Sequence, residues 1–142
     1  MSTDIEDIFR QAGLTTINGK KIRFGNKALR AQNASFGARN SNHKKRDPHT
    51  GNAMARDISI IGGNLNDYAE FRRQIMSNDL ISKYMDIKGW GIINEVTPQI
   101  LARTGGTGPH FHFGPDTWAR RTWQAWKNNP NAPITQAFKK GG

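Results

Sequence analysis

Strict alternation of histidine and phenylalanine in His110-Phe111-His112-Phe113 constrains the fold of this chain more than any other feature. In an extended strand, successive side chains point to opposite faces of the sheet. The two phenylalanines would then share one face and pack on a core, while the two imidazoles lie side by side on the other. The segment therefore predicts a strand with one packed face, although two surface histidines on an edge strand would give the same pattern.

A pair of neighbouring imidazoles on a rigid strand is what a catalytic zinc site requires, together with a carboxylate from another element and an open position for water. The chain contains no cysteine. This absence excludes disulfides and thiolate zinc ligands, so that any metal must be bound by histidine, aspartate or glutamate.

Three residues outside this strand are candidate ligands. Asp57 begins a short strand predicted over residues 57–61, where an aspartate either binds a ligand or serves only to cap a loop or pair with the adjacent Arg56. His43 and His49 both lie in a long polar segment, residues 25–51, and either of them can be an ordinary solvated histidine. A loop of this length is uncommon unless it is functional or disordered.

Glu95 is the candidate for acid–base chemistry. It lies in an otherwise apolar strand predicted over residues 90–96, where a carboxylate is costly to bury without a partner. An ion pair with an arginine would account for it, and so would a role as general base beside a metal-bound water.

Composition narrows the class of partner. The 142 residues carry 21 Lys and Arg against 11 Asp and Glu, a net charge of +10 that favours nucleic acid, anionic cell-wall polymers or membrane surfaces. No predicted helix has a basic stripe, and no strand alternates basic residues with exposed aromatics, so we expect no specific nucleic-acid binding. No run approaches the roughly 20 apolar residues of a membrane span, and the polar N-terminus predicts no signal peptide.

The remaining patterns predict an α+β fold, in which a small antiparallel sheet carries the metal site and helices flank it. Residues 1–129 are expected to form one domain, and residues 130–142 a flexible tail. A tight hairpin is predicted at Asn18-Gly19, which suits the positive φ angles of a type I′ turn. Predicted helix starts are Ser2 or Thr3, Asn66 or Asp67, Ser77, Thr97-Pro98 and Asp116.

Five stretches carry a family resemblance when they are read in order: Ser35-Phe36-Gly37-Ala38-Arg39, Ser41-Asn42-His43, Gly51-Asn52-Ala53-Met54-Ala55-Arg56-Asp57-Ile58, Gly91-Ile92-Ile93-Asn94-Glu95 and His110-Phe111-His112. They resemble the zinc peptidase superfamily of D-alanyl-D-alanine carboxypeptidases, hedgehog amino-terminal domains and lysostaphin-type endopeptidases. Residues 104–113 are also similar to the Thr-Gly-x-His-x-His-Phe strand of the lysostaphin-type branch.

The resemblance implies a role for each matching residue. His43, Asp57 and His112 would be the zinc ligands. His110 would orient water or stabilise the oxyanion, Glu95 would be the base, and Arg39 would bind a substrate carboxylate, a task suited to a planar two-pronged donor.

The sequence departs from the family pattern at two points. Thirteen residues separate His43 from Asp57, where the family has a short fixed gap, whereas seven separate His49 from Asp57. We favour His43 as the first ligand because Ser41-x-His43 and Arg39 keep the family's order, and His49 remains the alternative. The family's carboxypeptidases also place the catalytic acid closer to the last histidine than Glu95 is.

The function expected from these observations is that of a zinc-dependent peptidoglycan peptidase, of the D,D-carboxypeptidase or endopeptidase type. Its substrate would be a bacterial peptidoglycan peptide. A phage lysis enzyme or virion-associated hydrolase fits the missing targeting segment, with a place in the virion or in the host cytoplasm before release to the wall. The alternative is a phage virion structural protein, in contact with other virion proteins, that retains the fold with a vestigial or structural metal site.

Overall fold

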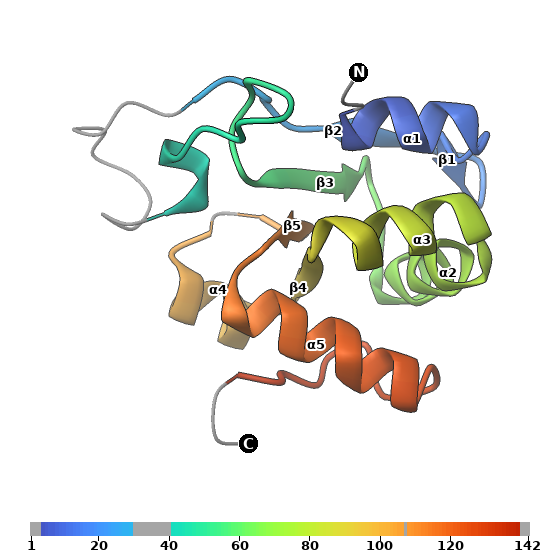
Figure 1. Cartoon of the computed structure of the whole chain (residues 1–142). Helices are drawn as coiled ribbons and strands as arrows, with labels where there is room; N and C mark the ends of the chain where they lie inside the picture. The colour runs from blue at the N-terminus through green and yellow to red at the C-terminus, as the bar shows by residue number, and fades with distance from the viewer. Residues whose placement is uncertain (1–3, 30–40, 107, 140–142) are drawn as a thin grey trace.

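The computed structural model describes residues 4–29, 41–106 and 108–139. Over these residues the chain has the predicted α+β fold, in which five helices flank a five-stranded antiparallel sheet of order β1-β2-β3-β5-β4 (Figure 1). The elements are α1 (Ile5–Gln11), β1 (Thr16–Ile17), β2 (Lys20–Phe24), the 3-10 helix η1 (Asn42–Lys44), β3 (Arg56–Ile60), α2 (Leu65–Ser77), α3 (Asp79–Lys88), β4 (Gly91–Glu95), α4 (Pro98–Thr104), β5 (His110–Gly114) and α5 (Thr117–Asn128).

Turn and cap residues account for several of these boundaries. Asn18 and Gly19 both have positive φ angles, 50° and 78°, and they join β1 to β2 as the hairpin pattern predicts. Thr97 caps α4 with Pro98 in the first turn, and the helix ends at Gly105 in the left-handed conformation. The predicted hairpin and the predicted start of α4 are therefore confirmed. Both were predictable because their sequence signals act over a few neighbouring residues.

Three predicted helix starts were wrong by one to three residues. The cap of α1 is Asp4, whose side chain accepts from the Glu6 N–H. The cap of α2 is Asn64, in a reciprocal capping box with Asp67 as the third helical residue, and the cap of α3 is Asn78. Each segment offers several neighbouring side chains that are able to cap, so local preference alone does not select among them.

The main core lies on one face of the sheet and is covered by helices. Phe9 of α1 packs edge-on against Phe113, with ring centroids 5.7 Å apart, and Phe71 of α2 stacks on Phe111 at 5.2 Å with an interplanar angle of 4°. Both phenylalanines of the alternating strand are fully buried. Their burial confirms the predicted packed face of β5 and leaves His110 and His112 on the opposite face.

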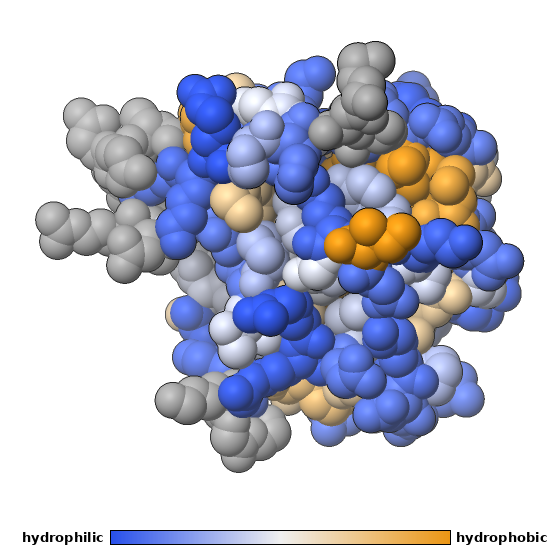
Figure 2. All heavy atoms as spheres, in the orientation of Figure 1, coloured by the Kyte–Doolittle hydropathy of each residue, from blue (hydrophilic) through white to orange (hydrophobic). Residues whose placement is uncertain are grey.

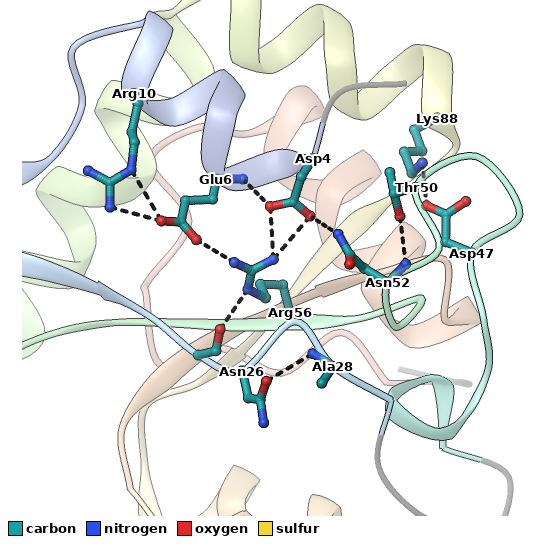
Figure 3. Close-up of polar contacts among 11 residues, drawn as sticks. Asp4, Glu6, Arg10, Asn26, Ala28, Asp47, Thr50, Asn52, Arg56 and Lys88 are labelled. Carbon is teal, nitrogen blue, oxygen red and sulfur yellow. Dashed lines mark hydrogen bonds and ion pairs between the residues drawn. The ribbon is translucent and has the colours of Figure 1, made fainter. Parts of the chain in front are cut away.

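A buried arginine fixes β3 to α1. Arg56 is 3 % exposed, and its guanidinium donates to both carboxylate oxygens of Asp4, to Glu6 and to the Gly25 carbonyl (Figure 3). Among the described residues, therefore, the carboxylates that pair with Arg56 belong to α1 and its cap, and Asp57 is not one of them. Alternation along the strand directs Asp57 to the other face, where it is free to bind a ligand.

The C-terminal segment corrects the prediction of a flexible tail from residue 130. Ala132 and Ile134 are buried in the core. The side-chain amide of Asn94 in β4 donates to the carbonyls of Ile134 and Gln136, at 2.6 and 3.0 Å. Over its described residues, the segment forms no helix or strand of its own. It is held by contacts with other elements, and such contacts leave no periodic pattern in the sequence.

The surface seen in Figure 2 is mostly hydrophilic, with apolar residues in small groups. Among the described residues, the large apolar side chains that are most exposed are Ile61, Leu65, Leu80 and Ile87. None of the helices in the described ranges is long and apolar enough to span a bilayer.

Candidate metal centre

Sheet register brings the candidate ligands together on the face opposite the core. Asp57 of β3 lies directly across from His112 of β5, and His110 lies directly across from Glu95 of β4. Directly paired residues point to the same face of a sheet. The register therefore gathers two carboxylates and two imidazoles from three adjacent strands at one place.

His43 completes the group from outside the sheet. It lies in η1, which is capped by the Ser41 side chain, and its Nε2 is 3.3 Å from Asp57 Oδ1. His112 Nδ1 is 3.2 Å from the same oxygen. One donor atom from each of His43, Asp57 and His112 lies within 4.8 Å of the other two, so these three residues can hold a metal ion.

The polar loop explains how His43 reaches Asp57 across thirteen residues. The backbone N–H of Met54 donates to the carbonyls of Asn42 and Lys45, and Arg46 pairs with Ala53 in an isolated bridge. The residues between His43 and Asp57 thus fold back on themselves, so that Met54 lies next to Asn42 at the start of the loop. The thirteen residues therefore form a compact loop that leaves His43 beside Asp57.

His49 lies on that loop and away from the ligand group. Its side chain is 73 % exposed, and its Nδ1 is 3.6 Å from a carboxylate oxygen of Asp47. The structure therefore places His43 with Asp57 and His112, and leaves His49 as a solvated histidine at the surface.

Asp116 belongs to the site, although its position in the sequence predicted only a helix cap. It does occupy the cap position of α5, but its side chain makes no capping hydrogen bond. Its Oδ1 instead lies 2.8 Å from His112 Nε2. A carboxylate in this position holds the proton on Nε2 and directs Nδ1 toward the ligand group. The one local signal is a carboxylate four residues after a histidine.

His110 and Glu95 form a second pair beside the ligands. The Nδ1 of His110 donates to the Gly108 carbonyl at 2.6 Å, and its Nε2 lies 2.7 Å from Glu95 Oε2. Glu95 is 4 % exposed, and this contact is the ion-paired partner that its burial requires. An imidazole and a carboxylate that share a proton at this distance can act together in acid–base chemistry.

Asp57, Glu95 and His110 also satisfy the spacing of a metal-binding group. However, His110 Nε2 approaches the same Asp57 Oδ1, at 3.6 Å, that His43 and His112 approach. Because three imidazole nitrogens converge on one carboxylate oxygen, the geometry points to one ion position rather than two.

Electrostatics couple these groups strongly. Burial by itself raises the pKa of Asp57, but hydrogen bonds from His112 and His43 hold the pKa of this carboxyl far below its usual range. Burial lowers the pKa of His112, yet hydrogen bonds to Asp116 and Asp57 outweigh it and raise that pKa to about 10. For His110, burial is outweighed by Glu95 and Asp57, and the pKa rises. A metal ion must therefore displace a proton from His112.

The group lies in an open cleft of about 690 Å³. Gly106, after α4, forms part of its wall, and a methyl group there would lie 3.3 Å from both Glu95 Oε1 and His110 Cε1 and 2.7 Å from Leu101 Cδ2. A glycine thus lets the backbone approach the acid–base pair closely. Arg39, the predicted carboxylate-binding residue, lies outside the described residues.

Comparisons of the chain with protein-family models, with curated proteins and with solved structures gave no match. The described residues define an α+β protein with a group of one aspartate and two histidines that can hold a metal ion, an adjacent histidine–glutamate pair and an open cleft above them.

Proposed function

We propose that the protein is a zinc-dependent peptidase that hydrolyses a peptide bond of bacterial peptidoglycan. The observation that carries the proposal is the convergence of His43, Asp57 and His112 donor atoms at the bottom of an open cleft, beside His110 and Glu95. Two imidazoles and one carboxylate are a set that zinc accepts in hydrolases, with a fourth position left for water or substrate.

When zinc is bound, it lowers the pKa of its water toward about 7 and polarises the scissile carbonyl. The protein's own residues supply the rest. Glu95 accepts the proton of the attacking water. Because the Nδ1–H of His110 is bound by the Gly108 carbonyl, the hydrogen bond to the developing oxyanion comes from its Nε2–H, which Glu95 releases once that carboxylate is protonated. Asp116 keeps His112 in the tautomer that leaves Nδ1 free to bind the ion.

Two observations support a peptidoglycan substrate. The motifs resemble peptidases of that class, and the net charge of +10 favours an anionic wall polymer. A phage origin, as a lysis enzyme or as a virion-associated hydrolase, is part of the same proposal. The alternative of a closed structural site requires a fourth protein ligand. His49 is exposed at the surface and His110 is engaged by Glu95, and both facts favour the catalytic proposal.

The test is reconstitution. Protein treated with a chelator and then dialysed against zinc is expected to release free amino groups from purified peptidoglycan, whereas chelated protein is not. His112→Ala should lose both zinc and activity, and His49→Ala, as the matched control, should keep both. A correctly folded wild-type protein that takes up no zinc and gains no activity would defeat the proposal.

A further inference from the structure

Three basic side chains line the cleft around the ligand group of His43, Asp57 and His112. They are Arg23 of β2, Arg103 of α4 and Lys139 of the C-terminal segment. All three are exposed. Within the described ranges no carboxylate lies within ion-pair distance of any of them, whereas Lys20, Arg56, Arg73, Lys88 and Lys127 each have such a partner. The walls of the cleft thus carry positive charge that the protein itself does not neutralise.

These cations lie on opposite sides of the ligand group. Arg23 is directly across from Ser59, which is two residues from Asp57, so Arg23 shares the open face of the sheet on the β2 side. Arg103 is in the helix between β4 and β5, at the other side of the sheet (Figure 1). Lys139 is on that side as well, and its ammonium lies 5.4 Å from the ring centre of Trp118.

The carboxylates of the cleft do not pair with these cations. Asp57, Glu95 and Asp116 each contact a histidine, and among the described residues none of them lies within ion-pair distance of Arg23, Arg103 or Lys139. A cleft lined by uncompensated charge of one sign attracts ligands of the other sign. Planar guanidinium groups in particular recognise carboxylates through two parallel hydrogen bonds.

We infer that the cleft selects a peptide with a free carboxylate on each side of the bond that is cut, one bound by Arg23 and the other by Arg103. Lys139 adds to the field on the Arg103 side. This inference rests on the proposed peptidase function and names its substrate class. It is separate from Arg39, since it uses only residues that line the described cleft.

The experiment compares native peptidoglycan with peptidoglycan whose free carboxylates have been amidated with carbodiimide and ammonia. Zinc-loaded wild-type protein should cleave the amidated material at least about tenfold more slowly, and Arg23→Gln and Arg103→Gln should each lose about tenfold on native material. On amidated material the two variants should match the wild type. Arg121→Gln, which removes an exposed cation of α5 outside the cleft, is the control for net charge.

Equal cleavage of both substrates by the wild type would overturn the inference, as would cleft variants no slower than Arg121→Gln. Failure of zinc-loaded protein to cleave either substrate would instead overturn the proposed function. Co-sedimentation with the two materials then decides the charge inference separately. Weaker binding to amidated peptidoglycan that depends on Arg23 and Arg103 supports it, and equal binding rejects it.

Discussion

Truncation of Arg56 to alanine tests how the strand that carries Asp57 is held in place. The guanidinium of Arg56 is buried between α1 and β3 and donates to Asp4, Glu6 and the Gly25 carbonyl (Figure 3). Removing one side of a buried ionic group is destabilising because the other side is left without its partner. The size of the effect depends on what the remaining groups still contact.

Those remaining contacts limit the loss. Asp4 still accepts from Asn52 and from the Glu6 N–H, and Glu6 still pairs with Arg10 at 2.8 Å. The Gly25 carbonyl and the two carboxylates each lose a charged donor, for about 1 kcal/mol apiece after this compensation. We therefore expect the free energy of unfolding to fall by about 3 kcal/mol, a factor of roughly a hundred in the folding equilibrium.

Urea unfolding followed by tryptophan fluorescence and circular dichroism measures this change. Arg73→Ala is the matched control, since Arg73 also pairs with a glutamate but its side chain is 65 % exposed. An exposed pair of that kind contributes only about 0.5 kcal/mol. If Arg56→Ala were no less stable than Arg73→Ala, the structural role assigned to Arg56 would be wrong.

Three further predictions follow from the site and its surroundings. In metal-free protein near pH 8, NMR should find His112 as an imidazolium. Asp116→Ala should move the titration of His112 to lower pH, because the hydrogen bond to Asp116 that raises the pKa of His112 is gone. An unchanged titration midpoint of His112 would argue against this contact. Glu95→Gln should keep zinc but lose at least about a hundredfold in peptidase rate, and retained activity would remove Glu95 from the mechanism. Hydrogen bonds from Asn18 and Lys20 lower the pKa of Asp67 to about 2 from 3.8, so it stabilises the fold above its unfolded pKa. That contribution should disappear as the pH falls through about 2, and the urea midpoints of wild type and Asp67→Asn should converge there; a gap independent of pH would contradict the assignment.

Local patterns in the sequence predicted the part of the molecule that depends on backbone periodicity and turn chemistry. Alternation in β5 predicted both the buried Phe111 and Phe113 and the pair of histidines on the opposite face. The Asn18-Gly19 turn and the Thr97-Pro98 helix start were likewise readable, because each acts within a few residues. Together with the family resemblance, these patterns also named five residues that the structure brings together around the cleft.

What sequence reasoning missed depends on contacts between distant segments. His43, which the sequence favoured over His49, lies beside Asp57 because hydrogen bonds such as those of Met54 close the loop, and spacing along the chain does not reveal these bonds. The side chain of Asp116 can either cap its own helix or bind His112, and in the folded protein it binds His112. The sequence does not show which of the two partners lies within reach. The order of the C-terminal segment depends on Asn94, forty residues away from Ile134.

The measurement that tests the central claim most directly is the zinc content of His43→Ala and His49→Ala proteins after equilibrium dialysis, measured by mass spectrometry of the metal. The account predicts about one zinc per chain in the wild type and in His49→Ala, and none retained by folded His43→Ala, because a site left with two ligands binds zinc weakly. Full zinc content in His43→Ala, or its loss in His49→Ala, would contradict the proposed metal centre.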